Sequence, residues 1–265
     1  MMVRAGFLIV LIAIAAAIAG PFLTPYDPSS QELARRLESP TLAHPLGLDE
    51  LGRDILARLL QGARISLMVG LAVVSVSSVA GMVFGSIAGY FGGWVDDAIS
   101  RVIDVLMAFP GILLAIALVA VLGPSLVNVV LALSVIGWVG YARLVRGQAL
   151  RAREFEFVQA ARASGASSVR IVLRHVLPAA IPSVVVQATL GMAGAIIAEA
   201  ALSFLGLGVQ PPTPSWGSML DAGRAHLFDA PHLTIAPGLA IATLVLGFNF
   251  LGDGLRDRVD PKMVR

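Results

Sequence analysis

Four polar side chains lie inside long apolar stretches of the sequence, where they could do chemistry. Two are carboxylates and two are amides: Asp104, Asn128, Glu199 and Asn249. An ionisable group in hydrocarbon costs at least about 2.5–3.5 kcal/mol, and it usually faces a protein interior or a water-filled cavity. The four residues are therefore candidates to line or gate a path through a membrane.

Glu199 is the most informative of the four, because neither Arg nor Lys lies within four residues of it in the chain. It could form a structural hydrogen bond to another helix, or it could face a cavity as a gating residue. Asp104 has a simpler alternative, since Arg101 lies one helical turn away and could neutralise it near the membrane interface.

A second group of candidates is basic and lies in the segment "QAARASGASSVRIVLRHVLP", residues 159–178. The pattern predicts a helical hairpin, with one short helix over 154–164, a stop at Gly165 and a second helix over 166–175. Each arm would have an apolar edge, made by Phe155 and Val158 on the first and by Val169 and Val172 on the second. Such a hairpin could enter a groove on another protein, or its arginines could meet anionic lipid headgroups.

Recognised catalytic motifs are absent from the sequence. It contains no G-x-x-x-x-G-K-[ST], no G-x-G-x-x-G after a strand, no H-E-x-x-H and no G-x-S-x-G. With no cysteine, disulfides and thiol chemistry are excluded. The four histidines are His44, His175, His226 and His232. They are predicted on both sides of the membrane, which argues against a shared metal site. We expect neither catalysis nor a bound metal in this chain.

The elements that position these residues follow from the composition. Of 265 residues, 57% are hydrophobic and 14% are charged, and the net charge is +2; a soluble domain has roughly 45–50% and 25%. Six apolar blocks can each cross about 30 Å of hydrocarbon as a helix: residues 6–23, 65–90, 102–123, 124–142, 177–207 and 233–251. Because the runs lack strand alternation, we predict an all-α membrane protein with six transmembrane helices.

Arginine and lysine predict the orientation, since short loops rich in them stay on the cytoplasmic side. With both termini inside (N-in/C-in), the cytoplasmic segments hold Arg4, Arg101, Arg143, Arg146, Arg151, Arg153, Arg162, Arg170, Arg174, Arg256, Arg258, Lys262 and Arg265. The opposite loop 208–232 holds only Arg224. The first block could instead be a cleaved signal peptide ending near Ala19, but its apolar run exceeds the usual length, which favours an uncleaved helix.

Small residues and a proline predict how the helices pack. Gly81, Gly85 and Gly89 repeat at a spacing of four, which lets another helix approach closely. Spacing alone leaves open whether that helix belongs to this chain or to a second subunit. Residues 109–111, Phe-Pro-Gly, interrupt the third block, and broken helices in bundles often line a path.

The hairpin resembles the EAA loop of the permease subunits of bacterial ATP-binding-cassette (ABC) importers. Ala160-Ala161, Gly165 and Leu177-Pro178 stand at the positions of that pattern, while Gln159 replaces its Glu and His175 its Ile. Two further stretches are similar to the dipeptide, oligopeptide and nickel branch, closest to its C-type dipeptide subunits. They are "HPLGLDELGRDILARLLQGARISL" (44–67), with Leu48 where Thr is common, and "ALSFLGLGVQPPTPSWGSML" (201–220).

This resemblance implies a type I ABC importer permease fold in the bacterial cytoplasmic membrane. It implies as partners a homologous B-type permease, one or two ABC ATPase subunits or a fused ATPase, an extracytoplasmic substrate-binding protein, a peptide substrate and membrane lipid, but no nucleic acid. ATP and Mg would bind to the partners, and this chain would hold no cofactor. The hairpin would couple to the ATPase through Gln159, Ala160, Ala161, Arg162, Ser164, Gly165, Ala166 and Arg170.

The expected substrate is a dipeptide or short peptide, and a nickel complex, glutathione or haem is the alternative within the same family. An ion-coupled secondary transporter or channel that uses Asp104 and Glu199 is a different class, and no internal repeat of the kind common in such proteins is evident. An intramembrane hydrolase would need a nucleophile and base that we do not find. We divide the chain into 1–63, the first helix with an extracytoplasmic loop containing an amphipathic segment, and 64–265, a five-helix core with cytoplasmic loop 143–176 and extracytoplasmic loop 208–232.

Overall fold

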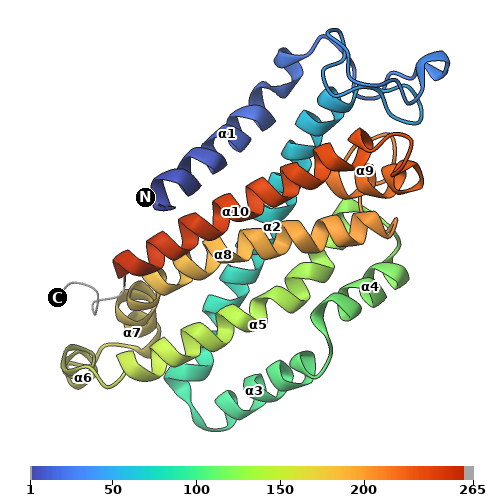
Figure 1. Ribbon diagram of the computed structural model, residues 1–265. Helices are drawn as coiled ribbons and strands as arrows, with labels where there is room; N and C mark the ends of the chain where they lie inside the picture. Colours follow the sequence, from blue (N-terminus) through green and yellow to red (C-terminus); the bar gives the residue numbers. More distant parts are fainter. Residues whose placement is uncertain (1, 260–265) are drawn as a thin grey trace.

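The computed structural model describes residues 2–259 and is built from helices (Figure 1). Within these residues the only β-type pairing is an isolated bridge between Leu48 and Asp54. The α-helices are α1 Met2–Leu23, α2 Ile55–Phe91, α3 Gly93–Met107, α4 Gly111–Leu122, α5 Leu126–Ala152, α6 Glu156–Ala163, α7 Ser168–Ile171, α8 Leu177–Phe204, α9 Trp216–Gly223 and α10 His232–Val259. Short turns are the 3₁₀ helices Leu33–Arg35 and Arg224–His226 and the π-helix Val172–Val176. The all-α prediction is confirmed, whereas Lys262 and Arg265 lie outside the described residues.

Five helices are long and apolar enough to cross a membrane, and a sixth span results if α3 and α4 count as one. That pair is bent by 86°. The break falls at residues 108–110, because Pro110 cannot continue the helix of α3 and stands as the N-cap of α4. The interruption that the Phe-Pro-Gly sequence predicted is therefore present.

Several predicted helix ends are wrong, because apolar length underestimates a helix whose ends are polar. α2 begins at Ile55 rather than at 65, since the Asp54 side chain accepts a hydrogen bond from the Ala57 N–H at 2.7 Å and caps the helix. The domain boundary predicted between 63 and 64 thus falls inside α2. In the same way α5 continues past residue 142 to Ala152.

The second hairpin arm and the fifth predicted span form one continuous helix, Ser168–Phe204. Pro178 therefore lies inside a helix. Because proline lacks an N–H and clashes with the carbonyl four residues earlier, it disturbs the regular ladder. The π-helical segment Val172–Val176 ends two residues before Pro178, and this wider turn accommodates the proline without ending the helix.

The bundle has two distinct ends, which we name by their contents (Figure 1). The hairpin end carries α6 and α7, and the loop end carries residues 24–54 and α9. α1 lies along α10, and a side chain at Gly254 would collide with Val3, so the start of α1 and the last turns of α10 are adjacent. These two chain ends lie towards the hairpin end in Figure 1.

The glycine stripe of α2 packs against α5 of the same chain, which answers the question that spacing left open. A Cβ at Gly81 would stand 2.9 Å from the Trp138 carbonyl oxygen, and one at Gly89 would stand 2.6 Å from the Arg146 carbonyl oxygen. Gly85 likewise lies directly against Ala142. Only glycine allows the two backbones to come this close.

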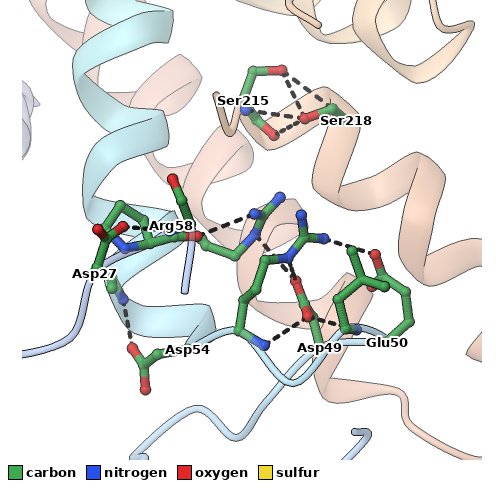
Figure 2. A network of polar contacts seen from close by, with 12 residues as sticks. Asp27, Asp49, Glu50, Asp54, Arg58, Ser215 and Ser218 are labelled. Carbon is green, nitrogen blue, oxygen red and sulfur yellow. Dashed lines mark hydrogen bonds and ion pairs between the residues drawn. The ribbon is translucent and has the colours of Figure 1, made fainter. Parts of the chain in front are cut away.

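At the loop end, a buried ion-pair network holds the chain that enters α2 (Figure 2). Asp49 accepts from the Arg53 guanidinium at 2.7 Å and pairs with Arg58 at 3.2 Å, and these three side chains are 6–8% exposed. Arg58 also donates to the Pro28 carbonyl at 3.3 Å. A separate buried pair joins His44 to Asp54 at 2.9 Å. Residues 24–54 are therefore folded onto the first turns of α2.

Candidate functional site

The hairpin reverses at Gly165 through a defined helix-ending motif. Gly165 has φ +83°, its N–H donates to the Arg162 carbonyl, and the Ala166 N–H donates to the Ala161 carbonyl, both at 3.0 Å. These are the paired bonds of a Schellman motif, which favours glycine at its left-handed position. Ser167 then caps the next helix by accepting from the Arg170 N–H. The predicted stop at Gly165 is confirmed.

The inner face of the hairpin is fixed to the ends of α2 and α5. Val158, Ile171 and Val176 are at most 3% exposed and pack against Tyr90, Ala149 and Ala152. The Arg162 guanidinium lies over the Tyr90 ring at 5.7 Å, within the range of a cation–π contact. The hairpin is consequently continuous with the helical bundle.

The outer face of the hairpin is open, basic and partly apolar. Of the residues predicted to contact an ATPase, Ala161 and Ala166 are half-buried. The others are exposed: Gln159, Ala160, Arg162, Ser164, Gly165 and Arg170. The predicted apolar edges are divided, because Val158 and Val172 point inward whereas Phe155 and Val169 are exposed. Phe157 and Leu173 are also more than half exposed. This surface combines arginines with apolar side chains and suits a groove on another protein.

Glu199 is fully buried in a cluster of serines close to the loop end. Its carboxylate accepts hydrogen bonds from the Ser203 hydroxyl at 2.7 Å and from the Ser66 hydroxyl of α2 at 3.3 Å. Of the two roles considered for it, the structure therefore has the hydrogen bond between helices. Its carboxylate is enclosed by protein in this conformation.

The other three polar candidates do not gather around Glu199 in the structure. Asp104 is exposed near the end of α3, not at the start of the span, and within residues 2–259 no ion pair joins it to Arg101. Asn128 donates to the carbonyls of Leu122 and Gly123 at 3.0 and 2.8 Å, which closes the turn between α4 and α5. Asn249 is half-buried in α10.

A cavity at mid-length of the bundle, open on one side, is lined by residues that the sequence did not single out. This central cavity of about 300 Å³ lies between α2, α4, α5 and α8, and its polar lining comes from Ser77, Tyr141 and Gln187. Hydroxyls and amides are common in transmembrane helices, so nothing in the sequence distinguished these three. The sequence feature that could have indicated the cavity is the number of glycines in α5 and α8, such as Gly137, Gly191 and Gly194. Across residues 2–259 we find no cluster of His, Asp or Glu able to hold a metal ion.

Two family models match the sequence of this chain. Residues 81–265 match the model of the binding-protein-dependent transport system inner membrane component, and residues 2–40 match the N-terminal transmembrane domain of oligopeptide transport permease C. The chain belongs to this transport family. It is therefore a permease subunit of an ABC importer, which confirms the resemblance found in the sequence.

Curated relatives match the permease subunit over nearly its whole length. The dipeptide transport system permease protein DppC of Alkalihalophilus pseudofirmus is 46% identical over 97% of this chain and 85% of its own. The glutathione transport system permease protein GsiD of Pectobacterium atrosepticum is 48% identical over 98% of this chain and 87% of its own.

Among solved structures, an inward-facing MetNI methionine ABC transporter has a similar chain. Its TM-score is 0.60 at 20% identity, and the match covers 76% of this permease and 96% of that chain. A second crystal form of the same transporter gives a TM-score of 0.61. At this identity the likeness supports the fold alone, which is that of an ABC importer permease.

Proposed function

We propose that this permease subunit imports dipeptides or short peptides across the bacterial cytoplasmic membrane in an ATP-driven complex. The observation that carries the substrate is the 46% identity to a dipeptide permease over 97% of the chain. Glutathione import is the second candidate, favoured by the 48% identity to a glutathione permease. Both cargoes are short peptides, so the two candidates require the same kind of passage.

The proposed complex pairs this chain with a homologous permease, ABC ATPase subunits and an extracytoplasmic substrate-binding protein. ATP and Mg bind to the ATPase partners, and this chain holds no cofactor. ATP hydrolysis is thus the partners' reaction, and the chain contributes a path and a means of coupling.

Six spans with both termini in the cytoplasm are the proposed topology, with α3 and α4 together forming the third. Two features support it. The hairpin end is rich in arginine, as short cytoplasmic segments are, and the start of α1 and the end of α10 lie towards that same end (Figure 1). Residues 24–54 and α9 then face the binding protein.

The hairpin is the proposed coupling element, docking its α6 tip in a groove of the ATPase. Its exposed arginines and apolar side chains form the contact, while Val158 and Ile171 fix it to the bundle. Coupling further requires that the ATPase bind the hairpin differently in its open and closed states.

Copurification of the complex from cells that express all of its components tests the coupling. Gly165→Arg places a bulky cation at the tip, and Gly165→Asn is the matched control because asparagine tolerates the left-handed conformation with a small side chain. We expect the ATPase to copurify with wild type and with Gly165→Asn, and to be lost from Gly165→Arg.

One result would contradict the importer proposal as a whole. If the purified chain alone takes up substrate into liposomes without ATP, the importer proposal fails. An ion-coupled mechanism that uses Asp104 and Glu199 would then be the explanation.

A further inference from the structure

The central cavity lies at mid-length of the long helices. Ser77, Tyr141 and Gln187 each stand near the middle of a long helix, and Gly111 brings the start of α4 to the same cavity. One wall is therefore the start of α4, which lies directly after the 86° bend between α3 and α4. Its volume of about 300 Å³ is at the lower end of ligand-sized pockets.

Ser77 stands at the wall of this cavity with its hydroxyl covered by α5. The residue is 1% exposed, and its hydroxyl has no partner among residues 2–259 and almost no accessible surface. The wall formed by α2 and α5 is therefore closely packed at this point. Gly137 preserves this arrangement, because any side chain there would collide with the Ser77 hydroxyl.

The lining of the central cavity is uncharged and mostly apolar. No Asp, Glu, Lys, Arg or His contributes to it, and of its polar side chains only the amide of Gln187 is exposed. The Tyr141 hydroxyl is buried and donates to the Gln187 carbonyl at 3.4 Å. The Gln187 amide can donate to and accept from a peptide backbone. A nickel ion, by contrast, would find neither imidazole nor carboxylate. Gly194 leaves room for side chains of different size, because a Cβ there would meet no atom within 4 Å.

We propose that the central cavity is this chain's part of the translocation path, with the exposed Gln187 amide as a hydrogen-bonding group for the backbone of the passing peptide. The proposal rests on the proposed function in peptide import. It places the path at Gln187 and Gly194 instead of at the path residues expected from the sequence, Glu199, Asn128, Asn249 and Asp104. Because this contact is a neutral hydrogen bond, it would hold the cargo weakly enough to release it.

Filling the cavity is the direct test, and Gly194 is the best place to do so. A Cβ at Gly194 meets no other atom within 4 Å, so the side chain of Gly194→Leu extends into open space. Gly147→Leu is the matched control, because Gly147 of α5 also has no atom within 4 Å and does not line the cavity. Both glycines are helical, so the change in backbone propensity is the same.

The complete complex in proteoliposomes provides two readouts, uptake of radiolabelled dialanine and ATP hydrolysis stimulated by the binding protein. We expect Gly194→Leu to abolish uptake while stimulated ATP hydrolysis continues, and Gly147→Leu to resemble wild type in both. Gln187→Leu should reduce uptake about fivefold, the effect of one lost hydrogen bond. Wild-type uptake by Gly194→Leu would overturn the path assignment and leave the importer function intact.

Failure of the proposed substrate looks different from failure of the path. If the wild-type complex hydrolyses ATP but imports neither dialanine nor glutathione, the peptide substrate is wrong.

Thiol labelling separates a blocked path from a misfolded variant. The chain has no native cysteine, so Gly194→Cys reports on the cavity alone when label is measured on this subunit. We expect a maleimide to modify it in the assembled complex, and saturating dialanine with the binding protein to slow that modification. Modification at an unchanged rate, or none at all, would overturn the proposal.

Discussion

The Glu199 carboxylate of α8 accepts a hydrogen bond from the Ser66 hydroxyl of α2, although the two residues stand 133 positions apart in the chain. Ser203, one turn further along α8, donates to the other carboxylate oxygen. A buried carboxylate thus joins two long helices near the loop end, and its role can be tested separately from transport.

Replacing Glu199 should lower the stability of the protein, and the loss should depend on whether the new side chain can still accept the two serine hydrogen bonds. Glu199→Leu leaves the Ser66 and Ser203 hydroxyls buried without an acceptor, so we expect the free energy of unfolding to fall by about 1–3 kcal/mol. Glu199→Gln keeps one oxygen and should lose less. Thermal unfolding in detergent measures both. Equal stability of all three proteins would contradict the hydrogen-bonding role, and unchanged transport by a stable variant would remove Glu199 from the transport mechanism.

The glycine stripe should tolerate no side chain where α2 meets α5. In Gly81→Val the new Cβ would stand 2.8 Å from the Ala142 backbone nitrogen, so the helices must separate. Overpacking of this kind costs about 1–3 kcal/mol. Gly147→Val, at an open position in α5, is the control. Melting temperatures of the two variants give the comparison, and a smaller loss for Gly81→Val would rule out the close approach.

Asp49 should be the most sensitive acidic residue of the loop end. Asp49→Asn leaves Arg53 and Arg58 buried without their shared carboxylate (Figure 2), a change that costs about 3–5 kcal/mol. We expect residues 24–54 to become susceptible to limited proteolysis. Glu50→Gln serves as the control, because Glu50 is 26% exposed and pairs with Arg53 alone. Resistance of Asp49→Asn equal to that of Glu50→Gln would show that the network does not hold the loop.

Asp96 and Arg146 should be energetically coupled, because their ion pair ties α3 to α5 through two hydrogen bonds. A double-mutant cycle with Asp96→Asn and Arg146→Gln should give a coupling energy of about 0.5–3 kcal/mol in thermal unfolding. Purely additive effects of the two substitutions would mean that α3 is held by its apolar contacts.

The sequence was sufficient for the architecture wherever apolar length or a glycine decides it. The helical class, the break at Pro110, the stop at Gly165 and the close packing at Gly81 are all local consequences of residue type. Helix ends were less predictable, because hydropathy falls at Arg58 and Arg151 although the helices continue through both. There, capping by Asp54 and packing against neighbouring elements determine where the helix begins or ends.

The candidate site could be predicted only in part. The hairpin is formed by one continuous segment of the chain, so its position could be predicted from the sequence. The partners of Glu199 and the lining of the central cavity come from helices that are distant in the chain, and only packing brings Ser77, Tyr141 and Gln187 together. Charge drew attention to Asp104 and Glu199, whereas the cavity is lined by uncharged groups.

The continuous helix from Ser168 to Phe204 has a mechanical consequence. Its 37 residues form a rod about 55 Å long, which begins in the hairpin, passes the central cavity at Gln187 and reaches the serine cluster at Glu199. A rotation imposed on the hairpin is transmitted along such a rod as a lever, with displacement that grows with distance from the pivot. Two irregular points interrupt its hydrogen-bond ladder, the π-helical turn at Val172–Val176 and Pro182 inside α8, so we expect bending to be concentrated there.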